Sequence, residues 1–207
     1  MDKADSDRMV ENQNHEGKNG KAYLLELSDA LRPLTDPGEI QAEAMRVLGE
    51  HLGPVRTQSW EAEPDGEHFR FEGGYAEEGP LISGQMQPND FGVRINGAFA
   101  AGRTVAVADV TADTRTSEAE LAAYDAAGVR AFIGVPMVKH GRLVALLGVH
   151  RAEAQAWTKD EIANTEQTAE GSRVAWLQSE TKTLESKHGQ YSNIAGRDDD
   201  TFFTATP

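Results

Sequence analysis

The 207-residue sequence contains no cysteine. This absence excludes disulfide bonds, thiolate zinc sites, nucleophilic cysteine chemistry and thioether attachment of a cofactor. Basic residues are scarce as well, because 20 Lys and Arg stand against 34 Asp and Glu, which gives a formal net charge of -14. Nucleic-acid affinity rests on clustered basic side chains, so we expect no nucleic-acid partner. No segment approaches the roughly 20 consecutive apolar residues of a membrane span, and we expect a soluble protein with no membrane partner.

Motifs for catalysis are also missing. Four of the histidines, His51, His68, His140 and His150, lack the spacing of metal ligands, and neither a Gly-x-Ser-x-Gly motif nor a phosphate-binding glycine loop occurs. The sequence therefore predicts no catalytic residue and no metal. Residues 1–21 are almost entirely polar, which predicts a disordered tail without an export signal and a cytoplasmic location. The remaining length suits a single domain of about 150 residues.

The most informative segment is a pair of apolar runs near the middle of the chain. Ala131 to Val138 and Leu143 to Val149 flank the polar insert Lys139-His140-Gly141-Arg142. The insert supplies a glycine where the chain must reverse, so these residues predict a β-hairpin. Because both runs are almost continuously apolar, we expect both faces of the hairpin to be covered.

Turn and cap signals divide the rest of the chain into helices and strands. Asp36 followed by Pro37 is typical of a helix start, and Ser117 with Glu120 and Thr158 with Glu161 are capping boxes. Strands in hairpins with helices at the ends favour an α+β fold on an antiparallel sheet. The expected elements are helices at 24–34, 37–52, from a cap at Asn89-Asp90 to 101, 118–127 and from 158 to about 188, and strands at 55–62, 67–75, 81–85, 104–110, 131–138 and 143–149.

This order of elements, together with the sequence from Gly128 to His150, resembles the GAF domain, a small-molecule sensing module, over residues 22–178. The motifs Asp90-Phe91-Gly92, Val105 to Asp109 and Ala156 to Ile162 are more narrowly similar to N-terminal GAF domains of bacterial sensor histidine kinases. The resemblance implies a sheet of about six strands, with the terminal helices on one face and short lid helices over a ligand pocket on the other. Residues 179–207 would be a helix extension and a disordered acidic tail, in which Phe202-Phe203 is an unexplained apolar pair.

A more distant resemblance to phytochrome GAF domains rests on Asp90, on Gly128-Val129-Arg130-Ala131 and on His150. Asp90-Phe91-Gly92 replaces the Asp-Ile-Pro of that family, and Glu120 stands where a histidine is expected. Without cysteine, no bilin can be attached covalently, and the methionine-sulfoxide-reducing GAF enzymes, which need cysteines, are also excluded. The identity of any cofactor stays open.

The resemblance and the residue types together give nine candidate ligand-binding residues. Asp90 either contacts a ligand or only caps the lid helix. Arg94 and Arg130 either face an anionic ligand group or pair with neighbouring acids. His150 is either a pH-sensitive, haem or bilin contact or a structural residue. The aromatic candidates, which would form an apolar wall or ordinary core, are Tyr75, Phe91, Phe99, Tyr124 and Phe132.

We therefore expect a non-enzymatic, small-molecule sensing GAF domain in signal transduction. It would form a homodimer through its terminal helices, and in a larger protein the last helix would lead to a kinase or another signalling domain. Two alternatives remain open at this stage. One is a degenerate GAF scaffold that binds a protein partner through the long helix and the acidic tail. The other is a photosensor that holds a bilin or haem without a covalent bond.

Overall fold

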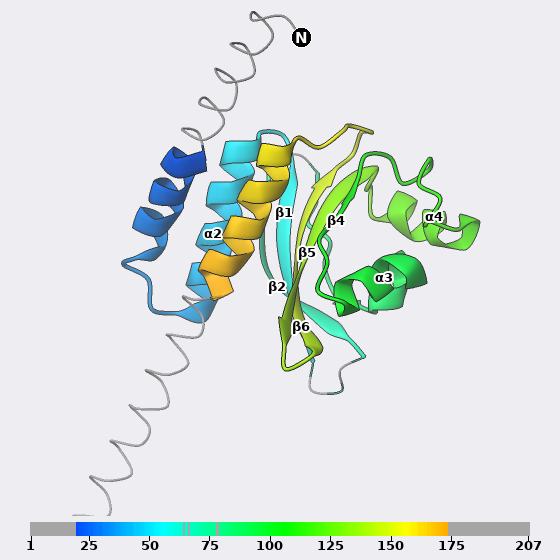
Figure 1. Ribbon diagram of the computed structural model, residues 1–207, viewed down its shortest axis with the longest axis horizontal. Coiled ribbons are helices and arrows are strands. Elements are labelled where there is room, and N and C mark those ends of the chain that lie inside the picture. The colour runs from blue at the N-terminus through cyan, green and yellow to red at the C-terminus, as the bar shows by residue number, and fades with distance from the viewer. Residues whose placement is uncertain (1–19, 64, 66, 78, 174–207) are drawn as a thin grey trace, which may run out of the picture.

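A six-stranded antiparallel sheet forms the centre of the protein, with the strand order β3-β2-β1-β6-β5-β4 (Figure 1). The computed structural model describes residues 20–63, 65, 67–77 and 79–173. The strands are β1 (Arg56–Ala62), β2 (Phe69–Ala76), β3 (Gln85–Met86), β4 (Val105–Val107), β5 (Ala131–Lys139) and β6 (Arg142–Arg151). The helices are residues 20–31, α2 (Pro37–Leu52), the 3-10 helix η1 (Pro88–Phe91), α3 (Val93–Ala100), α4 (Glu118–Ala126) and residues 159–173. The expected α+β fold is confirmed.

α2 and helix 159–173 lie against one face of the sheet, and helix 20–31 packs on their outer side (Figure 1). The cap predicted for α2 is present, because Asp36 Oδ1 accepts a hydrogen bond from the Glu39 amide at 3.0 Å and Pro37 is the first helical residue. α2 lies over β1 and β2, and its apolar side joins alternate residues of β5 and β6 in one core cluster. The buried core between these layers includes Tyr23, Leu27, Ile40, Ala44, Met45, Leu48, Ile133, Val135, Leu147 and Val149.

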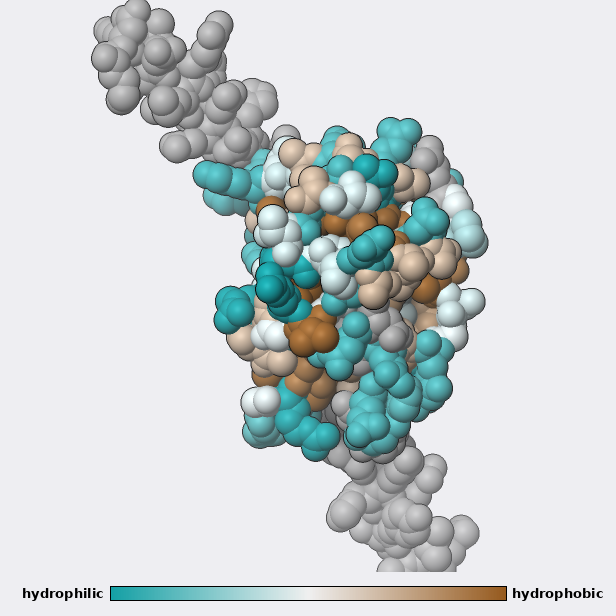
Figure 2. All heavy atoms as spheres, turned by 90° about the vertical axis from the view of Figure 1, so that its right-hand side faces the viewer, coloured by the Kyte–Doolittle hydropathy of each residue, from teal (hydrophilic) through white to brown (hydrophobic). Residues whose placement is uncertain are grey.

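The short elements η1, α3 and α4 lie on the opposite face of the sheet (Figure 1). We call this side the lid face and these three elements the lid. Hydrophilic and apolar side chains are mixed on its outer surface (Figure 2). Val93 of α3 is one of the most exposed large apolar residues of the described chain. A second cluster of buried side chains lies beneath the lid, and it contains Ile95, Phe99, Val105, Val107, Val110, Tyr124, Val129 and Phe132.

The predicted central hairpin is β5 and β6. His140 and Gly141 form its turn with φ values of 51° and 76°, and the two strands pair from Ala131↔Arg151 to Lys139↔Arg142. Side chains alternate between the two faces of a strand. Leu147 and Val149 therefore pack under the helices, whereas Leu146 lies beneath the lid. Both faces of the hairpin are covered, as expected.

Several predicted elements differ in the structure, and the strand predicted at 104–110 is limited to β4. The strand predicted at 81–85 is reduced to β3, because the side chain of Gln58 binds the backbone of Ile82 in place of a neighbouring strand. Gln58 Nε2 donates to the Ile82 carbonyl at 2.7 Å, and the Ile82 amide donates to Gln58 Oε1 at 3.1 Å. The prediction that Asn89-Asp90 caps α3 is also wrong. Asp90 belongs to η1, and the N-cap of α3 is Gly92 with φ of 118°.

Both ends of the chain continue past the described residues. Residues 20 and 21, which the sequence places in the tail, belong to the first helix. The capping box before helix 159–173 is confirmed, since the Thr158 amide donates to Glu161 Oε2 at 2.7 Å and the Glu161 amide donates to Thr158 Oγ1 at 3.2 Å. The continuation to about residue 188, the acidic tail and Phe202-Phe203 lie outside the described residues. None of the described helices is long and apolar enough to cross a membrane.

Candidate functional site

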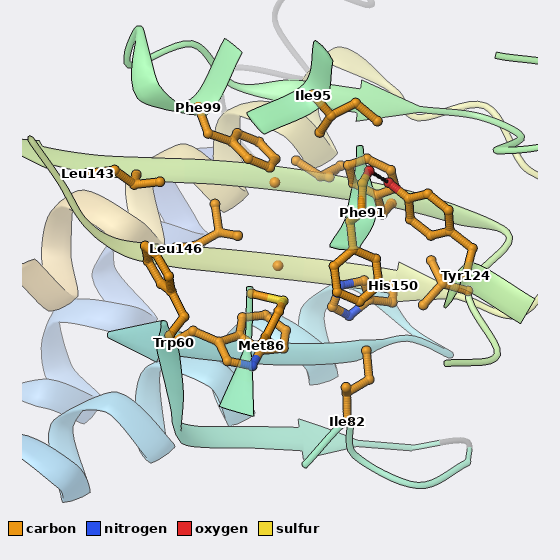
Figure 3. Close-up of a pocket in the computed structure, with 16 residues that line it drawn as sticks. Trp60, Ile82, Met86, Phe91, Ile95, Phe99, Tyr124, Leu143, Leu146 and His150 are labelled. Atoms are coloured by element: carbon orange, nitrogen blue, oxygen red, sulfur yellow. Dashed lines mark hydrogen bonds between the residues drawn. The ribbon is translucent and has the colours of Figure 1, made fainter. Parts of the chain in front are cut away.

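A narrow cavity of about 50 Å³ lies between the sheet and the lid (Figure 3). Its walls are almost entirely apolar and aromatic, as is typical of small-molecule sites. In the close-up, the rings of Phe91, Tyr124 and His150 lie toward one end, and Phe99 and Leu143 lie toward the other. The lining residues are Trp60, Phe69, Ile82, Met86, Phe91, Ile95, Phe99, Tyr124, Val129, Phe132, Ile133, Gly134, Leu143, Leu146, Gly148 and His150.

Two glycines create space on the floor of the cavity. Gly148 of β6 lies opposite Gly134 of β5 in the sheet. A Cβ atom at Gly134 would lie 2.5 Å from Cζ of Phe99, and one at Gly148 would lie 2.8 Å from Cε1 of His150. Both distances are shorter than real contacts, so the aromatic rings can pack directly over the sheet only because these two residues have no side chain.

The lid is tied together at its aromatic end. The Tyr124 hydroxyl donates to the Phe91 carbonyl at 2.6 Å, shown as the dashed line in Figure 3. The Tyr124 ring also stacks on Phe132, with centroids 5.7 Å apart, and burial raises the pKa of its hydroxyl. These contacts link α4, η1 and β5 around the cavity.

Glu120 makes a second link within the lid. Its carboxylate accepts the Ser117 amide at 2.6 Å, as the capping box predicts, and also the Val93 amide at 3.3 Å. It therefore serves the first turns of both α4 and α3. The hydrogen bond from Ser117 is the main reason why the pKa of Glu120 is lowered. Glu120, which stands where phytochrome GAF domains have a histidine, thus has a structural role in this protein.

His150 lines the cavity with a ring nitrogen that has no hydrogen-bond partner among the described residues. Its ring meets Trp60 edge-on, with centroids 5.7 Å apart, and the nitrogen without a partner is the buried Nδ1. Burial, with a smaller contribution from Arg56, lowers the pKa of His150 to about 3. The imidazole is therefore neutral near pH 7, and one ring nitrogen is left for a bound molecule to satisfy.

Arg56 lies next to His150 in the sheet, since the two are register partners on β1 and β6. Its side chain is 5% exposed. Its guanidinium donates to the carbonyls of Pro80 at 3.0 Å and Gly128 at 2.7 Å, and no carboxylate forms an ion pair with it in the described part of the chain. Burial lowers its pKa. Arg56 thus holds two connecting segments against the end of the sheet beside the cavity.

The structure brings together five of the nine predicted site residues. Phe91, Phe99, Tyr124, Phe132 and His150 all line the cavity. Sequence reasoning did not select Trp60, Gly134 and Gly148, nor Arg56 and Gln58 beside them. For three of these residues the sequence does contain a signal: side chains alternate along the predicted strand 55–62, which puts Arg56, Gln58 and Trp60 on one face of the sheet.

Three predicted residues lie elsewhere. Tyr75 faces the helices, where its ring covers Gly49 of α2. Arg94 is exposed and donates to the Thr114 carbonyl at 3.4 Å. Arg130 is exposed and pairs with Asp109 at 2.7 Å, an interaction that lowers the pKa of that carboxyl. Since neither arginine lines the cavity, the surface pairing is the better interpretation for Arg130. Asp90 lies in η1, immediately before Phe91.

The described residues contain no cluster of three or more His, Asp or Glu side chains that could hold a metal ion. The six-stranded antiparallel sheet and the cavity under short helices define an α+β domain with a pocket between the sheet and the lid. The GAF domain family model matches residues 36–171. The chain therefore belongs to the GAF domain family.

Several solved structures have the same fold. The GAF domain of PixJ from Thermosynechococcus elongatus, in its blue-light absorbing form, is 26% identical, with a TM-score of 0.62 over 74% of this chain and 94% of that chain. The phycoerythrobilin-bound GAF domain of a cyanobacterial phytochrome is 17% identical, with a TM-score of 0.68 over 79% and 97%. The free methionine-R-sulfoxide reductase of Neisseria meningitidis, in complex with its substrate, is 19% identical, with a TM-score of 0.64 over 79% and 91%. No curated protein matches the sequence.

Proposed function

We propose that this protein is a non-enzymatic sensory GAF domain that binds a small, largely apolar molecule between the sheet and the lid. The observation that carries the proposal is the apolar cavity whose floor contains two glycines and whose buried His150 Nδ1 has no partner among the described residues. An unpaired polar atom in an apolar site is costly unless a ligand or water satisfies it. A ligand with one hydrogen-bonding group and an aromatic body matches these walls.

The size of the cavity indicates how binding would produce a signal. About 50 Å³ holds a few water molecules, whereas a dry engineered cavity of about 150 Å³ is needed to take up benzene. A ligand must therefore displace lid side chains, and Phe99 over Gly134 is the ring that occupies most of the floor. Because Tyr124 and Glu120 tie α4 to η1 and α3, displacement of one lid element would move the others.

The absence of an enzymatic role is part of the proposal. The polar atoms among the lining side chains belong to Trp60, Tyr124 and His150, and the Tyr124 hydroxyl is already used by Phe91. No lining residue pairs a nucleophile with a base. The chain also has no cysteine, so it has no thiol for redox or nucleophilic chemistry.

A matched pair of probes, phenol and toluene, tests the proposal. Phenol can hydrogen-bond to neutral His150, whereas toluene has a similar shape without that group. We expect both probes to shift the amide resonances of Gly134 and Gly148 in titrations of the full chain, and phenol to bind about fivefold more tightly. In His150→Phe this preference should disappear, and in the control His68→Phe, on an exposed turn, it should remain. If neither probe shifts these resonances, the proposal is wrong.

That negative result would favour a second candidate, a GAF scaffold that no longer takes up a ligand. The observation in its favour is that side chains already fill most of the cavity.

A third candidate, non-covalent bilin or haem binding, requires a much larger opening than the structure has. Visible absorbance of the purified protein would establish it, and a colourless protein would exclude it.

We also propose that the domain forms a homodimer through its terminal helices and passes the signal to a kinase or another signalling domain. Leu24 and Leu25 on helix 20–31 are 40% and 66% exposed. They form an apolar edge beside the three-helix layer, where a second copy would cover them.

A further inference from the structure

A second hollow lies beside the cavity, at the tip of the central hairpin. It is an open groove of about 710 Å³, within the usual size range of small-molecule sites. Lys139, His140 and Arg142 line it from the hairpin, and α3 contributes Asn96 and Ala100. We call this hollow the hairpin groove.

The hairpin groove and the internal cavity have two apolar residues in common. Phe69 and Leu143 line both hollows, so these two side chains form the partition between them. Phe69 is 2% exposed and Leu143 is half-buried. A molecule in the groove would therefore lie against Leu143, with the buried Phe69 behind it, and movement of these two side chains would lead it into the cavity.

The charge of the groove is opposite to that of the protein. The whole chain has a formal charge of -14, yet the two basic residues Lys139 and Arg142 stand on either side of the His140-Gly141 turn. Arg142 is exposed and forms no ion pair among the described residues. The one acidic residue that lines the groove, Glu63, already accepts a hydrogen bond from Gln85 at 2.8 Å.

The backbone of the turn supplies an independent observation. His140 has φ of 51° and is the only non-glycine residue of the described chain with a positive φ. Two-residue hairpin turns of this type favour Asn or Gly at that position, because other side chains are strained there. Such strain is concentrated at functional sites, and here it accompanies an imidazole that lines the groove.

We propose that the hairpin groove binds an apolar organic anion. The anionic group lies against Arg142 and the adjoining Lys139-His140 turn, and the apolar body lies against Phe69 and Leu143, next to the cavity. A guanidinium offers the fork geometry that suits a carboxylate or sulfonate. The inference rests on the proposed sensory function, and it adds the charge of the ligand and the side from which the ligand enters.

Two fluorescent dyes with the same aromatic skeleton test the inference in the full chain. 8-Anilinonaphthalene-1-sulfonate carries one negative charge, and N-phenyl-1-naphthylamine carries none. We expect the sulfonate to bind the wild type about tenfold more tightly at low salt. Arg142→Gln should weaken sulfonate binding about fivefold and leave the neutral dye unchanged. Added salt should reduce the preference, because the groove is exposed.

Arg32→Gln is the control, since it makes the same change of charge at an exposed residue in the turn after helix 20–31, where Arg32 pairs with Asp29. Equal losses of sulfonate binding in the two variants, or equal affinities of the two dyes for the wild type, would overturn the anion site and leave the cavity proposal intact. If the neutral dye does not bind and phenol leaves the Gly134 and Gly148 amides unshifted, the cavity proposal fails as well. Near-identical circular dichroism spectra of the variants would establish that both are folded.

Discussion

Arg56 and His150 illustrate how neighbouring residues decide a protonation state. They are register partners, both face the lid side, and neither forms an ion pair among the described residues. Burial disfavours the charged form of each group. Arginine does not lose its proton in proteins, so the histidine stays neutral. Arg56 therefore has two effects: it binds the Pro80 and Gly128 carbonyls, and it helps to keep His150 available as an uncharged hydrogen-bonding group.

The first prediction concerns the pH dependence that follows. The pKa of His150 is about 3 in the folded protein, against 6.5 for a histidine exposed to water. Below pH 6.5 the unfolded chain binds a proton that the folded chain does not, so this residue lowers stability as the pH falls toward 3, by about 1.4 kcal/mol per pH unit. His150→Phe removes this dependence. Urea unfolding at pH 7, 6 and 5 should show the variant gaining about 1 kcal/mol relative to the wild type between pH 6 and 5.

Carboxylates that titrate in the same range are common to both proteins, so they cancel in this comparison. Asp65, whose pKa is lowered to about 2 by His68 and two backbone amides, titrates below the three pH values and does not affect the comparison. A constant difference in the free energy of unfolding across the three pH values would contradict the neutral, buried state of His150.

At the scale of elements, two glycines in helices have opposite surroundings. Gly49 of α2 packs against the Tyr75 ring, where an added Cβ would lie 2.2 Å from Cδ1. Gly97 of α3 has open space at the same position. Alanine is intrinsically better than glycine inside a helix, by about 1 kcal/mol. The difference between the two sites is therefore a difference in packing alone.

The second prediction uses this pair. Gly97→Ala should raise the free energy of unfolding by about 0.5–1 kcal/mol, because it gains helix propensity without a clash. Gly49→Ala should lower it by about 1 kcal/mol or more, because overpacking against Tyr75 exceeds the propensity gain. Urea denaturation of the two variants measures both values. Stabilisation by Gly49→Ala would show that Tyr75 does not pack on α2 as the structure has it.

At the scale of the whole molecule, the sheet separates the lid from the helices on its other side (Figure 1). The lid face holds the cavity, and the helical side carries the exposed Leu24 and Leu25. A ligand on one side can affect a partner on the other only through the strands between them. β5 and β6 contribute side chains to both layers, and they are therefore the physical connection that the sensory proposal requires.

The third prediction tests the proposed dimer by sedimentation velocity. Leu25→Glu puts a charge on the helical face at a residue that is 66% exposed, so it should abolish the dimer and leave the stability of the monomer unchanged. Val93→Glu is the matched control, because Val93 is 67% exposed but lies on α3 of the lid. A wild-type protein that remains a monomer at high concentration would refute the dimer, and so would equal dissociation of the two variants.

The chain itself determined the elements that depend on local interactions. The caps at Asp36, Ser117 and Thr158 join groups three residues apart, so sequence spacing is sufficient to find them. The central hairpin followed from its apolar runs and its glycine in the same way. The order of these elements, with a few short motifs, then led to the GAF resemblance that the family model confirms.

Only the tertiary structure decided which aromatic residues meet. Phe69 lines the cavity and Tyr75 faces the helices, although both are odd-numbered residues of one strand. A bulge opposite Ser59 and Trp60 shifts the register, because Ser59 pairs with Gly73 and Trp60 with Phe71. One extra residue turns every later side chain to the other face. Local spacing therefore defines the elements of this protein, whereas the site depends on register between distant strands, which no short stretch of sequence contains.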